Sequence, residues 1–270
     1  MKWVVTLSAE RVDVERLLSQ RLDGLSKDPD DPRQLHMTLI DPEGEATGEE
    51  ASGLARAKIE VSVERLNGVG RLRWGRTFGG VSVAAVRSYD DDGRSTQVVF
   101  AGTAVGHMLP EDFADVVERL GDPRPALPKG VEIVNGLDFG ASLELADTVP
   151  EATRAIHLVE LMLRGDDEID WAAGYAALEI VEHHLDSAGL RGQQLGWWTK
   201  RERGDFRATA NSPEALGHSA RHGKPSGLKE ARMTTKEASW FVRRVVAQWL
   251  TALSADGLRD DRVDDLSASS

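Results

Sequence analysis

A polar stretch of the chain, NSPEALGHSARHG at residues 211–223, combines side chains that bind phosphate with side chains that transfer protons. A histidine titrates near neutral pH, so His222 can act as a general acid or base. Arg221, directly before it, can stabilise the negative charge that develops on a phosphate. These two residue types suffice for metal-free RNA cleavage, in which the 2′-hydroxyl attacks the adjacent phosphorus in line. The stretch therefore predicts a phosphate-directed site around His222.

Other side chains near this pair can contact the same phosphate. Arg207 is a third candidate catalytic residue, and further binding residues are expected at Asn211, His218 and Lys224. A structural role is the alternative for the pair, since Arg and His side chains also cap helices or pair with local groups. Residue chemistry alone slightly favours the structural role. We expect no cofactor and no metal at this site.

Charge is unevenly distributed along the sequence. The whole chain has a net charge of −12, yet residues 195–250 carry eleven Lys and Arg against five Asp and Glu. This basic segment therefore has a net charge of +6. The acidic total argues against a general nucleic-acid coat protein, which needs many bases for phosphate neutralisation. The basic segment is either a phosphate-binding face or a solvated surface whose charges pair with acidic residues, and the sequence does not choose between them.

Composition excludes several other classes of protein. The absence of cysteine removes disulfides, thiolate zinc sites and cysteine nucleophiles together. No apolar run approaches the roughly 20 residues of a membrane span, and the first residues lack the pattern of a secretory signal. We therefore expect a cytoplasmic protein without a membrane partner. Its 270 residues are enough for two domains.

The first part of the chain is expected to form a mixed α/β domain over residues 1–147. Period-2 and helical patterns predict alternating elements, with turns at Gly68, Gly70, Gly79 and Gly80. The expected elements are a strand at 3–7, a helix at 12–25, a strand at 35–40, a helix at 51–66 that ends at Asn67-Gly68, a hairpin of strands at 81–86 and 97–105, and a short helix at 110–120.

The second part is expected to be an all-α helical bundle over residues 148–254, followed by a disordered acidic tail at 255–270. Capping boxes predict two helix starts, at Thr148 with Glu151 and at Thr234 with Glu237. The expected helices cover 148–163, 170–185 and 234–253, with a shorter one near 197–198. The fold class is therefore α+β, an N-terminal mixed α/β domain followed by a C-terminal bundle.

Two further groups of residues have a chemical and a structural interpretation. Glu179 and His183 lie four apart on one helix, and His157 and Glu160 lie three apart on the preceding one, as metal ligands can. The order of ligands typical of di-metal bundles is absent, so a solvated helix end is the preferred interpretation. Trp197-Trp198, ahead of several bases, could stack on single-stranded nucleic acid, but a place for at least one Trp in the bundle core is favoured.

His222-Gly223 is followed, after a short spacer, by the amphipathic segment MTTKEASWFVRRVVAQWL at residues 233–250. This order resembles the last part of HEPN-type domains, helical bundles in which a polar His motif precedes a final amphipathic helix. The resemblance covers about residues 150–253. Many HEPN-type proteins are dimeric ribonucleases of bacterial defence and toxin systems, with an active site where two copies meet. The resemblance therefore implies a homodimer and a metal-independent endoribonuclease.

The chain departs from the catalytic motif of that family, an Arg followed after four to six residues by a His. His222 matches the motif His, but residues 215–217, five to seven positions before it, are Ala-Leu-Gly. Arg221 or Arg207 would have to replace the motif Arg, and the spacing leaves both open. Some relatives of this type have lost cleavage and serve as binding or dimerisation modules.

These observations together predict an intracellular RNA-directed effector of a bacterial defence or stress system. It would bind RNA or another phosphate-bearing ligand at the basic segment and cleave it without a metal. The alternative is a non-catalytic dimerisation or binding module with a sensing N-terminal domain. A metal-dependent bundle enzyme built on Glu179 and His183 is a distant third.

Overall fold

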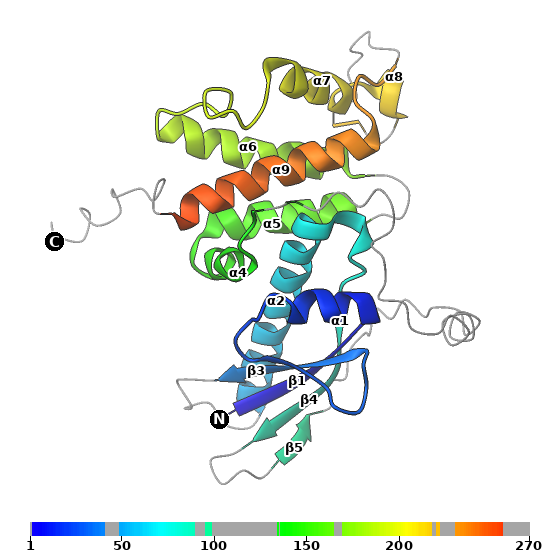
Figure 1. Cartoon of the computed structure of the whole chain (residues 1–270), viewed down its shortest axis with the longest axis vertical. Helices are drawn as coiled ribbons and strands as arrows, with labels where there is room; N and C mark the ends of the chain where they lie inside the picture. The colour runs from blue at the N-terminus through cyan, green and yellow to red at the C-terminus, as the bar shows by residue number, and fades with distance from the viewer. Residues whose placement is uncertain are drawn as a thin grey trace, which may run out of the picture. The chain divides into compact units, whose positions relative to one another are not determined.

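A computed structural model describes residues 2–40, 49–89, 95–98, 134, 136–164, 169–217, 220–221 and 230–255 (Figure 1). The chain divides into two compact units. Unit 1 comprises Met1–Glu60 and Val81–Val131, and unit 2 comprises Val61–Gly80 and Glu132–Ser270. The boundary expected between residues 147 and 148 differs from this division. An antiparallel sheet in unit 1 and a set of helices in unit 2 confirm the α+β fold class.

The sheet of unit 1 has five antiparallel strands in the order β2-β3-β1-β4-β5. The strands are β1 (Lys2–Ala9), β2 (Leu25–Lys27), β3 (Gln34–Ile40), β4 (Val81–Tyr89) and β5 (Ser95–Val98). In the central strand β1, Trp3, Val5 and Leu7 are buried, as alternation along a strand requires. Leu7 lies opposite the buried Leu35 of β3, so one face of the sheet forms part of the core.

Helix α1 (Arg11–Leu18) completes this core through the fully buried Val14 and Leu17. The predicted helix over 12–25 is right only for its first two turns. Arg21 and Gly24 have positive φ values of 52° and 74°, which an α-helix cannot contain, and Leu25 already begins β2. The apolar residues Leu22 and Leu25 continue the helical spacing beyond Leu18, although the helix itself has already ended there.

The expected hairpin of strands is confirmed in its pairing. β4 and β5 are antiparallel, with Tyr89 opposite Ser95 and Val86 opposite Val98. The turn between them, the residues after β5, the predicted helix at 110–120 and the predicted tail from 256 onward lie outside the described residues. Gly80, at φ +96°, lies in the connection that enters β4, as predicted.

Helix α2 (Glu49–Trp74) contradicts the predicted helix end at Asn67-Gly68, because it continues through both residues. Gly68 and Gly70 are not turn residues but points of close packing. A Cβ atom on Gly68 would lie 2.4 Å from Cγ2 of Ile156, and one on Gly70 would lie 2.3 Å from a ring carbon of Phe78. Glycine is needed at these positions because neighbouring side chains occupy the space of a Cβ atom.

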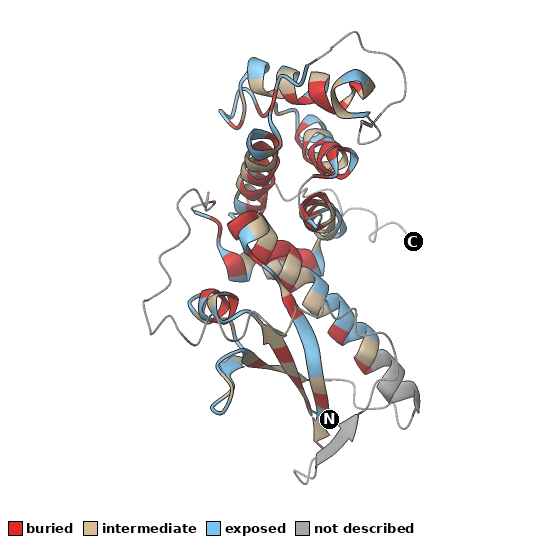
Figure 2. Cartoon of the chain, turned by 90° about the vertical axis from the view of Figure 1, so that its right-hand side faces the viewer, coloured by how far each residue is buried: buried red, intermediate tan, exposed pale blue. Residues whose placement is uncertain are grey.

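Unit 2 gathers the second half of α2 with the remaining helices (Figure 1). These are a short 3₁₀ helix η1 (Gly75–Thr77), α4 (Phe139–Thr148), α5 (Pro150–Leu163), α6 (Trp171–Ser187), α7 (Lys200–Ala210), α8 (Pro213–Leu216) and α9 (Thr235–Ser254). α5, α6 and α9 pack against one another. The buried residues of α9 include the runs 241–243 and 245–247 and so cover more than half of its surface (buried residues are red in Figure 2). The predicted stripe of α9 is confirmed by buried Phe241, Val245 and Trp249.

Of the two capping boxes predicted in the second part of the chain, the structure contains one. The Thr234–Glu237 capping box of α9 is confirmed, and Thr199 with Glu202 forms a further one at α7. The box predicted at Thr148 is wrong: α5 begins after Val149, and Thr148 ends α4, where its hydroxyl donates to the Glu144 carbonyl over 2.9 Å. Helix α4 occupies a stretch whose sequence shows no clear periodicity. Over the described ranges, no helix is both long and apolar enough to span a membrane.

Candidate functional site

Helix α7 carries the first of the predicted site residues and is anchored by a single aromatic side chain. Phe206 is fully buried, with ring centroids 5.6 Å from Trp171, 6.2 Å from Tyr175 and 5.5 Å from Phe241. These partners belong to α6 and α9, so α7 is fixed to both helices. Arg207, the next residue, is exposed.

The last turn of α7 is hydrogen-bonded to Arg221, which precedes residues 222–229, and to Arg232 and Met233, which follow them. The amide of Arg221 donates to the carbonyl oxygen of Ala210 over 2.8 Å. On the other side, the hydroxyl oxygen of Thr209 accepts from the amides of Arg232 at 2.9 Å and Met233 at 3.2 Å. Thr209 is itself fully buried, so these are well-shielded hydrogen bonds. The two ends of the segment that contains His222 therefore attach to adjacent residues of α7.

Three of the predicted site residues meet at this helix end. Asn211 is the C-cap of α7, and its backbone amide donates to the carbonyl of Arg207 over 3.2 Å. Arg221 is hydrogen-bonded to Ala210, the residue before Asn211. The side-chain oxygen Oδ1 of Asn211 is buried and has no hydrogen-bond partner among the residues that the structure describes. His218, His222 and Lys224 lie outside the described residues.

The guanidinium of Arg221 is already engaged by α6. Its Nη2 donates to Oε1 and Oε2 of Glu179 over 3.0 and 3.3 Å, and its Cζ lies 4.0 Å from the centroid of the Tyr175 ring. Arg203 of α7 repeats this pattern one turn along α6, with an ion pair to Glu182 and its Cζ 5.0 Å from the same ring. The two arginines therefore form a ladder on α6, held by two carboxylates and one aromatic ring.

The ladder fixes the charge state of Arg203. Burial lowers the pKa of Arg203, but the hydrogen bonds and the negative charge of Glu182 raise it by more, so the pKa lies above its ordinary value. This guanidinium is a permanent cation whose charge is balanced locally by Glu182.

Most described bases of the basic segment are likewise balanced by neighbours. Ion pairs join Arg201 and Arg232 to Asp205, and Arg244 to Glu202. These ion pairs favour the interpretation in which the bases pair with acidic residues. Arg207 and Lys200 differ, because both are exposed and within the described ranges no carboxylate pairs with either. Of the two, Arg207 is the one in the last turn of α7.

Trp197 lies in the core, as favoured from sequence for at least one of the two neighbouring tryptophans. Trp197 is 9% exposed, and its carbonyl oxygen accepts from Arg244 over 2.8 Å. The ring of Trp198 lies so close to Gly192 that a Cβ atom there would be 2.0 Å from it. Stacking of a nucleic-acid base on Trp197 would require the core to open.

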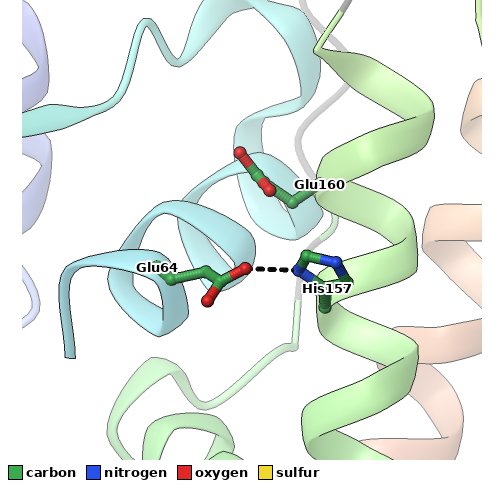
Figure 3. A group of neighbouring side chains, drawn as sticks. All are labelled: Glu64, His157 and Glu160. Atoms are coloured by element: carbon green, nitrogen blue, oxygen red, sulfur yellow. Dashed lines mark ion pairs between the residues drawn. The ribbon is translucent and has the colours of Figure 1, made fainter. Parts of the chain in front are cut away.

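The structure brings possible metal ligands together on α2 and α5, and not around Glu179 and His183 of α6. Glu179 and Glu182 are paired with Arg221 and Arg203, and among the described residues they do not form a group of three ligand side chains with His183. Glu64 of α2 instead lies beside His157 and Glu160 of α5, and one ligand atom of each lies within 4.8 Å of the others (Figure 3). The sequence indicated His157 and Glu160 as a possible ligand pair on α5, but it did not indicate Glu64 of α2.

No protein-family model, curated protein or solved structure matches the chain. The resemblance to HEPN-type domains therefore rests on the order of the sequence segments alone.

Proposed function

We propose that the chain is an RNA-directed effector whose unit 2 binds RNA phosphate at the end of α7 and cleaves it without a metal. The observation that supports this most directly is the attachment of residues 221 and 232–233 to the last turn of α7. Both ends of the segment containing His222 are thereby tied to the turn that carries Arg207 and ends at Asn211. A site needs this kind of fixed framework around a catalytic residue.

The roles of the residues follow from their chemistry. His222 would act as general base toward the 2′-hydroxyl and as general acid toward the leaving oxygen. Arg207 would stabilise charge on the phosphate, and the side-chain amide of Asn211 would donate a further hydrogen bond. Arg221 is held by Glu179 and Tyr175, so its role is to position the adjacent His222. A homodimer, as in many HEPN-type proteins, would supply a second copy of the same groups.

A non-catalytic binding module is the second candidate. It is favoured by the ladder on α6, in which the carboxylates compensate Arg203 and Arg221. The ion pair of Arg221 with Glu179 has a structural role whether or not a catalytic residue lies nearby. Arg207 also lies in the last turn of α7, where a cation stabilises the helix dipole without any ligand.

RNA binding by the full chain tests the proposal. A fluorescently labelled single-stranded RNA is titrated with the protein at two salt concentrations, with a double-stranded DNA of similar length for comparison. Saturable binding that weakens with salt is expected when basic side chains bind phosphates. Absence of RNA binding at both salt concentrations would overturn the proposal. A concentration-dependent oligomer without RNA binding would establish the binding-module alternative.

A further inference from the structure

The group formed by Glu64, His157 and Glu160 contains one buried carboxylate, that of Glu160 on α5 (Figure 3). Glu160 is 6% exposed and is paired with Arg164, whose Nη2 lies 2.7 Å from Oε2 and whose Nε lies 3.3 Å from Oε1. A buried carboxylate must be compensated by positive charge. The side chain of Arg164 is 58% exposed, so it can turn to solvent when another cation replaces it.

The other two side chains are already positioned to share one cation. Nδ1 of His157 lies 2.5 Å from Oε1 of Glu64, and both side chains are about half exposed. Neighbouring ligands of one ion at bond lengths of about 2.1 Å lie roughly 3 Å apart, so a small rotation suffices. His157 and Glu160 are three apart on α5 and share a face, and Glu64 points toward that face from α2 (Figure 3).

The types of ligand determine which ion fits. One imidazole nitrogen with two carboxylates is suited to Zn²⁺, Mn²⁺ or Fe²⁺, whereas Ca²⁺ and Mg²⁺ prefer oxygen ligands only. Three protein ligands leave at least one coordination position for water or another ligand, as in metal sites that interact with substrates.

A pocket supplies access to that open position. It has a volume of about 630 Å³ and is lined by both Glu64 and His157, with Arg65 and Arg154 among its other walls. Arg65 is ion-paired with Asp147, which also lines the pocket, so the exposed Arg154 is the base that would attract an anionic ligand toward the ion. The ligands and the pocket all belong to unit 2.

We infer that Glu64, His157 and Glu160 bind one divalent transition-metal ion, with an open coordination position facing this pocket. The site is separate from the end of α7 and is not needed for the metal-free cleavage proposed above. It gives α5 and the second half of α2 a ligand-binding role besides their packing through Gly68 and Ile156.

Titration of the chelator-treated full chain with ZnCl₂ by calorimetry tests this site. One equivalent should bind, and Glu64→Gln and His157→Gln should each weaken binding by at least about tenfold, since even the loss of an outer-sphere partner has that effect. Replacing Zn²⁺ by Co²⁺ should give visible absorption bands that His157→Gln alters. The two substituted side chains are half exposed, so both variants should keep the wild-type circular dichroism spectrum.

His183→Ala is the matched control, because it removes an exposed histidine from the neighbouring helix α6. It should bind Zn²⁺ as the wild type does. Lack of saturable binding by the wild type, or equal affinities for wild type, Glu64→Gln and His157→Gln, would overturn the assignment.

Discussion

Arg243 of α9 donates its Nε hydrogen to the carbonyl oxygen of Leu72 in α2 over 2.9 Å. Its Nη2 donates to the carbonyl of Arg73 over 2.6 Å, and the residue is only 4% exposed. The last carbonyls of a helix have no partner within the helix, so one buried guanidinium caps the end of α2. This interaction ties two segments of unit 2 that are about 170 residues apart in the chain.

Arg243→Ala should therefore destabilise unit 2 severely. Hydrogen bonds to charged groups contribute about 1.5–3 kcal/mol each, and the carbonyls left behind are shielded from water, so a loss of about 3 kcal/mol or more is expected. Urea unfolding monitored by tryptophan fluorescence measures it. Arg201→Ala is the control, since its side chain is 91% exposed and its removal should cost under about 0.5 kcal/mol. Similar losses in the two variants would contradict the capping role.

Gly68→Ala should destabilise the protein although alanine is the better helix former. The gain in helix propensity is about 1 kcal/mol, but the new Cβ would lie 2.4 Å from Ile156 Cγ2 and 3.3 Å from the Ile156 carbonyl oxygen. Overpacking costs about 1–3 kcal/mol, and these neighbours cannot easily move. Thermal unfolding of the full chain measures the net effect.

Gly204→Ala provides the opposite case on α7. Nothing lies within 4 Å of a Cβ atom there, so only the helix propensity changes and the variant should be stabilised by about 0.5–1 kcal/mol. Stabilisation by both substitutions would show that Gly68 is not a packing residue.

These glycines also show where sequence reasoning ends. Local rules found β1, β3, the β4–β5 pairing and the start of α9, because alternation and the Thr234–Glu237 box depend on neighbouring residues. The same rules placed a turn at Gly68, since a glycine in a helix is recognisable as a packing residue only once its partner, Ile156, is known. The predicted start of α5 at Thr148 was wrong for a similar reason. Thr148 is the last residue of α4, and the sequence of α4 has no clear helical periodicity that would have revealed this helix.

The candidate site was predictable in part for the same reason. Arg207, Asn211 and Arg221 were chosen by type and proximity in sequence, and the structure brings them to one helix end. The partner of Arg221 was not predictable. Glu179 lies 42 residues away in the sequence, and nothing in the sequence of its helix indicates which arginine or lysine it would pair with. Likewise, the pair on α5 gave no indication of Glu64.

Stability should fall on acidification through the capping boxes. The amide of Thr234, and then its hydroxyl, hydrogen-bond to the Glu237 carboxylate and hold its pKa below the value of 4.5 for an unperturbed Glu. A carboxylate with a lowered folded-state pKa stabilises the fold above the unfolded-state pKa, and this contribution is lost as the pH falls through the folded-state pKa.

Glu237→Gln keeps the shape of the cap and removes its charge. The melting temperature of the wild type should exceed that of the variant at pH 7, and the difference should shrink as the pH falls below about 4.5. A difference that stays constant from pH 7 to pH 3 would show that ionisation of Glu237 does not stabilise α9.

Arg207→Ala should weaken RNA binding at low salt and reduce its salt dependence. Removal of one basic side chain that neutralises a phosphate lowers the slope of log K against log[salt] by about one unit. Arg201→Ala removes the same charge from the same helix, but its guanidinium is paired with Asp205. It should change the slope less. Equal effects of the two substitutions would indicate general electrostatic attraction and not phosphate binding at the end of α7.

The proposed cleavage is tested most directly by incubating the full chain with total RNA in EDTA, beside His222→Ala and His183→Ala. We expect RNA fragments with the wild type and with His183→Ala, intact RNA with His222→Ala, and the same melting temperature for all three proteins. Intact RNA in every reaction, or fragments that persist with His222→Ala, would contradict metal-free cleavage by His222.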